Sequence, residues 1–332
     1  CGEYGSGLFH WQQLLGRKVQ YLSTNKGKLT VSFVSYAQNF EDVMLWRALK
    51  HVQNGVYVDV GAQHPVIDSV SKAFYEHGWR GIHIEPVLEY AELLRKDRPD
   101  ETVLQVALSD TEGTLELNVI PDTGLSTAVD THAQRHQSER GFEYQKIQVP
   151  VLTLKSALKS LVGKDVHWLK IDVEGLEEQV LKGWDSLTLR PWVMVVEATI
   201  PNSPEQDYSS WDPILTRADY QFVYFDGLNR FYVAKEHEEL EGAFMSPPNV
   251  FDDMMLTANS YICRGLVASH QAREKELNHQ TGALETELAT RSEHTAQREH
   301  ELTSAREQIN VLEANAKASR GERASLRLLA AA

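Results

Sequence analysis

The stretch that decides the fold is residues 166–177, which read Val-His-Trp-Leu-Lys-Ile-Asp-Val-Glu-Gly-Leu-Glu. Its first part is apolar enough for a strand that is buried on both faces of a sheet, and Asp172 and Glu174 follow directly. An amphipathic stretch, 176–183, comes next. A buried strand that ends in acidic residues and passes at once into a helix is typical of a parallel α/β sheet.

The chain up to about residue 264 repeats this alternation of strand and helix. Candidate strands are 56–60, 81–85, 102–107, 166–172, 192–198, 221–226 and 230–234. Candidate helices are 9–22, 39–49, 68–77, 87–97, 176–183 and 211–218. We therefore predict an α/β fold with a mostly parallel, seven-stranded sheet and an insertion at 114–151. Only residues 227–229 separate the last two strands, which predicts an antiparallel hairpin at one edge.

The amino-acid composition changes near residue 264. From 265 to 332 there is no proline and no aromatic residue, and nine basic residues nearly balance ten acidic ones. A single heptad phase fits this tail, with a seam that is apolar at both ends and polar in the middle. The seam residues are Leu277, Thr281, Leu284, Leu288, Arg291, Thr295, Arg298, Leu302, Ala305, Ile309, Leu312 and Ala316. The pattern predicts a helical coiled-coil tail, and a solvated single helix or a flexible extension is the alternative.

These divisions predict four parts of the chain. They are an N-terminal segment 1–34, a domain 35–248, a linker 249–264 and the tail 265–332. We expect the tail to form a homo-oligomer or to contact a partner protein, because polar seam residues commonly fix register and partner choice.

Length and charge narrow the class of protein. The chain has 332 residues, and 42% hydrophobic residues are enough for a proper core. Its formal net charge of −14 disfavours nucleic acid as a partner. Its longest apolar runs are far shorter than the ~20 residues of a membrane-spanning helix. Its two cysteines, Cys1 and Cys263, indicate neither a disulfide framework nor a zinc site, and we expect a reducing, cytoplasmic location.

Acidic side chains follow three predicted strands in order. The first strand runs into Asp59-Val60-Gly61-Ala62, the second into Glu85-Pro86, and the third into a turn that contains Ser109 and Asp110. A carboxylate at the second of these places can accept both hydrogen bonds from the hydroxyls of a ribose. The order and spacing suit an adenosine ligand, with Asp110 placed for the adenine amino group.

The sequence disfavours two other kinds of nucleotide-binding site, one for dinucleotides and one for nucleoside triphosphates. Residues 61–66 read Gly-Ala-Gln-His-Pro-Val and lack the second and third glycines of a dinucleotide-binding fingerprint. Their absence disfavours an NAD-dependent oxidoreductase. The sequence also lacks the glycine-rich loop with lysine and serine or threonine that cradles nucleoside triphosphates.

The fourth and fifth strands end in a group of acids: Asp172, Glu174 and Glu197. Acids on adjacent strand ends must be paired, protonated or bound to a cation. Asp172 or Glu174 could act as a general base toward a substrate hydroxyl. Alternatively, Asp172 and Glu197 could hold Mg²⁺, which would polarise that hydroxyl. A structural role in capping the next helix is the alternative for Glu174 and for Glu177.

Together these segments resemble the FkbM family of S-adenosylmethionine-dependent methyltransferases. The resemblance rests on Asp59-Val-Gly-Ala62, Ile84-Glu-Pro86, Ala107-Leu-Ser-Asp110 and Leu169-Lys-Ile-Asp-Val-Glu-Gly175, and it runs from about residue 35 to about residue 248. Further similar segments are Tyr36-Ala-Gln-Asn-Phe-Glu-Asp42, Gly124-Leu-Ser-Thr127 and Val149-Pro-Val-Leu-Thr-Leu154. Gln63, His64 and Pro65 depart from the family pattern, in which asparagine and a further glycine often follow.

The resemblance implies a Rossmann-like class I methyltransferase fold, S-adenosylmethionine as cofactor and O-methylation of a hydroxyl, often in polysaccharide or secondary-metabolite biosynthesis. It implies that Asp59, Gly61 and Ala62 lie at the methionine end, Glu85 at the ribose, and Ser109 with Asp110 at the adenine. Asp172, Glu174 and Glu197 would face the acceptor. Glu41 and Asp42 would cap the cofactor or lie on a helix surface. Candidates for acceptor recognition are Ser126, Thr127, His132, His136, Asp226, Asn229 and Arg230. A methyltransferase-fold scaffold that presents the tail to partner proteins is the alternative function.

Overall fold

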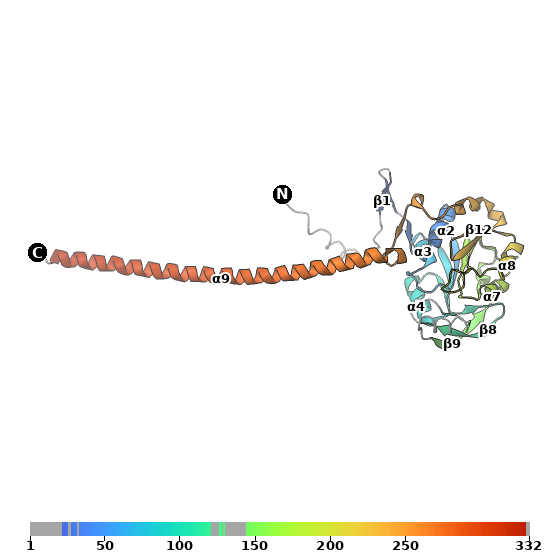
Figure 1. The fold of residues 1–332 in the computed structure, drawn as a ribbon, viewed down its shortest axis with the longest axis horizontal. Helices are drawn as coiled ribbons and strands as arrows, with labels where there is room; N and C mark the ends of the chain where they lie inside the picture. The colour runs from blue at the N-terminus through green and yellow to red at the C-terminus, as the bar shows by residue number, and fades with distance from the viewer. Residues whose placement is uncertain are drawn as a thin grey trace. The chain divides into compact units, whose positions relative to one another are not determined.

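The computed structural model describes residues 22–25, 28–31, 33–120, 126–127, 129 and 144–329. The chain divides into two compact units, Cys1–Cys263 and Arg264–Ala332. Figure 1 shows strands and helices wound around a central sheet in the first unit, and a single long helix in the second. The helix expected at 9–22 lies outside the described residues, except for Leu22, which begins a strand.

A mixed sheet forms the centre of the first unit. Its strand order is β12-β13-β11-β10-β4-β5-β6. The strands are β4 (Val56–Val60), β5 (Arg80–Ile84), β6 (Thr102–Leu104), β10 (Trp168–Ile171), β11 (Val193–Glu197), β12 (Tyr220–Phe225) and β13 (Asn229–Ala234). Neighbours from β6 to β11 are parallel, whereas β13 is antiparallel to both β11 and β12. The α/β class and the edge hairpin are thus confirmed, and the sheet is mixed rather than uniformly parallel.

Side chains of the central strands alternate between two cores, because successive residues of a strand point to opposite faces. Val58 and Val60 pack with α6 (Leu154–Ala157), α7 (Glu177–Lys182) and α8 (Asp212–Arg217). Tyr57 packs on the other face with α2 (Glu41–Leu49) and α3 (Val70–Glu76). This alternation turns Asp59 toward the α2 and α3 face. Helix α4 (Leu88–Asp97) joins β5 to β6.

A smaller sheet accounts for the predicted insertion. It has the order β7-β9-β8, with β7 (Ala107–Leu108), β8 (Gly113–Val119) and β9 (Gln145–Leu152). The single strand expected at 102–107 is therefore wrong. The chain leaves the central sheet after Leu104, and Ala107 pairs with Val151 of β9. The residues after β7 consequently do not lie at an end of the central sheet.

Short elements complete the first unit. They are the hairpin of β1 (Leu22–Asn25) with β2 (Lys28–Val31), the parallel pair of β3 (Phe33–Ser35) with β14 (Met254–Leu256), and the 3₁₀ helices Lys159–Leu161, Lys235–Phe244, Val250–Asp252 and Tyr261–Cys263. The segment 249–264, which we expected to be a linker, thus contributes a strand to the first unit.

The second unit is the helix α9 (Arg264–Leu329), which has 66 residues. It confirms the prediction of a long C-terminal helix. Within the described part of the chain, no helix combines the length and the apolar composition that crossing a membrane requires.

Candidate active site

A cavity of about 600 Å³ opens where β4, β5 and β10 end. The chain runs from β4 outward to β5 and β6, and later returns to place β10 on the other side of β4. Such a reversal of strand order leaves a crevice at the carboxyl ends of the strands, where open α/β sheets bind ligands. The lining includes Asp59, Gly61, Ala62, Glu85, Asp172 and Glu174. These six predicted site residues therefore share one cavity.

Asp59 is held in place from the side of α3. It is 3% exposed, and Ser71 Oγ donates a hydrogen bond to its Oδ2 at 2.5 Å. Ser71 Oγ in turn accepts a hydrogen bond from the buried guanidinium of Arg98, at 2.7 Å from Nη1. The same guanidinium donates to the carbonyl of Pro65 and to Ser69 Oγ. Arg98 thus links the loop after β4, through Pro65, to the carboxylate of Asp59 at the end of that strand.

Gly61 allows two strand ends to approach each other. Its φ is +79°, and a Cβ built on it would lie 1.7 Å from the carbonyl oxygen of Asp172. Its N–H donates to the carbonyl of Ile84 at 2.9 Å. A side chain at this position would collide with the backbone after β10, so the glycine is needed for the shape of the cavity floor as well as for its lining.

Glu85 presents a fixed carboxyl group to the cavity. Its Oε1 accepts the N–H of Val87 and its Oε2 accepts the N–H of Gln63, each at 2.8 Å. Its pKa is raised to about 7, because burial, together with the charge of Asp59, outweighs the lowering by the two backbone hydrogen bonds. Each oxygen keeps a lone pair after accepting its backbone hydrogen bond. The group can therefore also accept hydrogen bonds from a diol.

Lys170 was missed by the sequence analysis and lies at the centre of the polar lining. It is the register partner of Asp59 on the neighbouring strand, and its Nζ lies 2.5 Å from Asp172 Oδ2. Burial lowers the pKa of Lys170, but the charges of Asp172, Glu41 and Asp59 outweigh it and raise the pKa above its ordinary value. The only sequence signal was a charged residue inside an apolar strand, which needs a partner of opposite charge.

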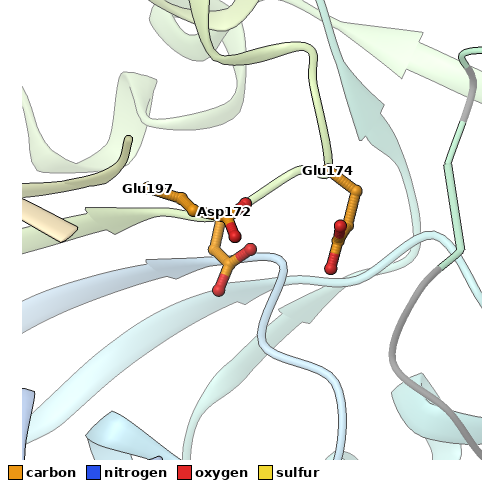
Figure 2. A group of neighbouring side chains, drawn as sticks. All are labelled: Asp172, Glu174 and Glu197. Atoms are coloured by element: carbon orange, nitrogen blue, oxygen red, sulfur yellow. The ribbon is translucent and has the colours of Figure 1, made fainter. Parts of the chain in front are cut away.

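Asp172, Glu174 and Glu197 form the acid cluster that the sequence predicted (Figure 2). One carboxylate oxygen of each lies within 4.8 Å of one from each of the others. Burial, followed by the charge of Asp172, raises the pKa of both Glu174 and Glu197 well above the ordinary range. Asp172 and Glu174 are among the described residues that line the cavity, whereas Glu197 is not.

The acid cluster fits a bound Mg²⁺ poorly, although its oxygens are close enough for one. The ammonium group of Lys170 already pairs with Asp172 and supplies a positive charge where the ion would bind. A Mg²⁺ ion prefers near-octahedral oxygen ligands and keeps several waters, which an adjacent ammonium group opposes. The metal assignment to Asp172 and Glu197 therefore stays a prediction, which the spacing of the oxygens allows and the adjacent ammonium group disfavours.

The segment before β4 contributes Gln38 and Glu41 to the cavity lining. Glu41 begins α2, lines the cavity and accepts hydrogen bonds from the N–H of Asn39 and from Asn229 Nδ2, both at 2.9 Å. Burial and the charge of Asp226 raise its pKa to about 7. Asp42 instead accepts hydrogen bonds from Ser35 and Tyr36, so it anchors the preceding segment.

Several predicted residues lie away from the cavity. Ser109 and Asp110 are not among its described lining residues, and Asp110 borders a separate depression with Lys155 and Lys182. The structure gives the adenine assignment of Asp110 no support, because Asp110 follows β7 rather than a strand of the central sheet. Glu177 accepts hydrogen bonds from the N–H groups of Val173 and Gly175, as expected of a helix-capping acid.

The proposed acceptor residues are similarly divided. Ser126 lines the cavity, and the Thr127 hydroxyl donates to the carbonyl of Glu174 at 2.8 Å. Arg230 lies between the rings of Tyr208 and Phe222, at 3.9 and 3.7 Å from their centroids. The side-chain amide of Asn229 donates hydrogen bonds to the carboxyl groups of Asp226 and Glu41. His132 and His136 lie outside the described residues.

The other end of the cavity is apolar and was not predicted. Its lining comes from α4, from β7 and the residue before it, and from β8. The apolar residues are Val87, Tyr90, Leu93, Val106, Ala107, Leu108, Leu115 and Leu117, and α4 also contributes Glu89 to the cavity lining. A flat apolar ring system could bind there, while hydroxyl groups reach Glu85.

Comparison with known proteins gives the following matches. Residues 59–222 match the family described as the methyltransferase FkbM domain. No curated protein matches the chain. A TehB-like SAM-dependent methyltransferase from Corynebacterium glutamicum is among the similar solved structures, with 8% identity and a TM-score of 0.33. The match covers 58% of this chain and 87% of that one. The resemblance to the FkbM family that the sequence predicted is thus confirmed over residues 59–222.

Proposed function

We propose that the protein is an S-adenosylmethionine-dependent O-methyltransferase. The observation that carries this proposal is the division of one cavity into a polar end with Asp59, Glu85 and Asp172 and an apolar end of aliphatic side chains. An adenosine with a charged amino-acid tail has the same division. The family match supports methyl transfer in general.

The residues fit the parts of this cofactor as follows. Glu85 accepts the hydrogen bonds of the ribose hydroxyls, since both its oxygens are fixed by backbone N–H groups. The apolar end between β8 and α4 holds the adenine, for which the sequence had instead predicted a contact with Asp110. Asp59, Gly61 and Ala62 lie at the methionine end, where the carboxylates of Asp59 and Glu41 suit its ammonium group.

The acid cluster then serves the acceptor. When bound, S-adenosylmethionine supplies a methyl group that its sulfonium already activates, so positioning contributes most of the catalysis. A hydroxyl acceptor must also lose its proton. Asp172 takes that proton as general base, because its carboxylate lines the cavity and is held in place by the ammonium group of Lys170. Burial and the charge of Asp172 raise the pKa of Glu174 and of Glu197, which favours the protonated forms that can donate hydrogen bonds.

The acceptor class follows from the family resemblance. Domains of this kind often act in polysaccharide or secondary-metabolite biosynthesis, so we propose a hydroxyl of a sugar or glycan. Ser126, which lines the cavity close to Thr127, can contact such an acceptor. On the usage of its two cysteines, we place the protein in the cytoplasm.

Calorimetry tests the cofactor assignment without a known acceptor. The full chain is titrated with S-adenosylhomocysteine and, separately, with NADH. We expect saturable binding of the first and none of the second. Binding of NADH alone would favour the oxidoreductase reading, and binding of neither would remove the proposed cofactor site. Adding EDTA and then Mg²⁺ to the same titration should leave the affinity unchanged.

A scaffold that presents the C-terminal helix to other proteins is the second candidate. The observation that favours it is the length of α9, which has 66 residues and to which the proposed reaction assigns no role. An Asp172→Ala variant separates the two functions. If the protein is an enzyme, this variant loses methyl transfer to an extract of cellular glycans. If the protein is a scaffold, the variant still binds its partner proteins.

A further inference from the structure

The side chains of the C-terminal helix α9 are exposed along almost its whole described length. From Arg264 to Gly321, every residue except Val267 is exposed. Helices in proteins gain most of their stability from packing an apolar face. A series of i,i+4 ion pairs can also support a helix, but the described part of α9 shows one, between Glu287 and Arg291 at 2.6 Å. A helix of this length therefore needs a partner along its side.

The large aliphatic side chains of α9 lie on one stripe between residues 277 and 316. There are seven of them, and all but Val311 occupy the heptad seam. The seam takes two positions in seven, so an even spread would place about two of them there. The six seam residues are Leu277, Leu284, Leu288, Leu302, Ile309 and Leu312, and they are 46% to 69% exposed. A stripe of this kind is the contact face of a two-stranded coiled coil.

We propose that two copies of this chain associate through residues 277–316 of α9 as an antiparallel coiled coil. In this pairing Leu284 of one copy faces Ile309 of the other, and Thr281 faces Leu312. The remaining layers pair a small residue with a larger one or a polar residue with an apolar one, apart from a polar central layer. These layers are Leu277 with Ala316, Leu288 with Ala305, Arg291 with Leu302, and Thr295 with Arg298.

A second copy is the occupant that the charges favour. On one flank of the seam the antiparallel pairing brings Glu285 to Arg306 of the other copy, and on the other flank it brings His294 to Glu301. The remaining flanking pairs join a carboxylate to a neutral residue or two neutral residues. They are Asn278 with Glu313, Ser292 with Glu299, Gln280 with Asn315, and Glu287 with Gln308. The helix is thus complementary to itself, with no pair of like charges on either flank.

The seam arginines decide the orientation. A parallel pairing in register would place Arg291 against its own copy, and Arg298 against its own copy one heptad later. Two layers of facing like charges are destabilising in the core of a coiled coil. In the antiparallel pairing Arg291 faces Leu302 and lies next to Glu301, to which its guanidinium can extend while its stem covers the leucine.

The mass of the full chain in solution is the first test. Light scattering should give about twice the chain mass of 37.6 kDa. Leu312→Asp places a charge on the seam and should halve that mass, whereas Val311→Asp changes the neighbouring off-seam residue and should not. A single-chain mass for the unmodified protein, or equal effects of the two substitutions, would overturn the proposal. If Leu312→Asp cannot be purified, dilution of the unmodified chain should reduce the mass and the helical circular dichroism together, and a helix unchanged at the single-chain mass would again contradict it.

Cross-linking tests the orientation. On a background with Cys1→Ser and Cys263→Ser, one variant carries Thr281→Cys and a second carries Leu312→Cys. Oxidation of the mixture should form a disulfide between the two different variants. Disulfide dimers of Thr281→Cys alone would show a parallel pairing and overturn the antiparallel arrangement. Neither measurement depends on methyl transfer, so either can fail while the proposed enzyme function stands.

Discussion

The two ends of the cavity are built in different ways. The polar end uses residues at the end of β4 or within three positions after β5 and β10, such as Asp59, Glu85 and Asp172. The apolar end uses side chains such as Leu115 and Leu117 from β8, which belongs to a separate sheet. Local sequence thus determines the polar groups, whereas the apolar wall exists only after distant segments have packed together.

This difference predicts that the strand-end turns of the polar end tolerate backbone change least. Gly61→Ala should lower the free energy of unfolding by about 3–5 kcal/mol, because its Cβ would meet the carbonyl of Asp172 and the residue has a φ of +79°. Gly113→Ala, at the start of β8, is the matched control, since its Cβ would have no atom within 4 Å. Urea denaturation should place that control within about 0.5 kcal/mol of the unmodified chain. Similar effects at the two glycines would contradict the prediction.

The same difference explains what the sequence could predict. The sequence could place Asp59, Glu85 and Asp172 at the strand ends, where they line one cavity, because an acid that ends an apolar strand is a local pattern. Asp110 was misplaced by the same rule, since the strand before it belongs to the small sheet and not to the central one. Lys170 was missed because its partners on β4 and α2 depend on strand order, which no single segment contains.

The pH dependence of stability tests the burial of charge at the polar end. The pKa of Glu85 is about 7 in the folded chain against 4.5 ordinarily, so the folded state binds more protons between these values. Stability from this group is therefore complete below about pH 4.5 and is lost as the pH rises through 7. Between pH 5 and pH 8 the unmodified chain should lose about 2–3 kcal/mol more than Glu85→Gln, which cannot titrate. Urea denaturation at both pH values measures this, and parallel losses would show that Glu85 is not the group concerned.

Ligand affinity compares the two ends directly. Glu85→Ala should weaken binding of S-adenosylhomocysteine by about 1–3 kcal/mol, because it leaves the ribose hydroxyls without acceptors. Leu115→Ala should weaken it by about 1 kcal/mol, because a half-buried side chain loses part of its apolar contact. Calorimetry with adenine alone separates the two roles. Leu115→Ala should weaken adenine binding as much as it weakens that of the full ligand, whereas Glu85→Ala should leave adenine binding unchanged. An effect of Glu85→Ala on adenine would place this carboxyl group at the base instead of the sugar, and the assignment of the two ends would have to be exchanged.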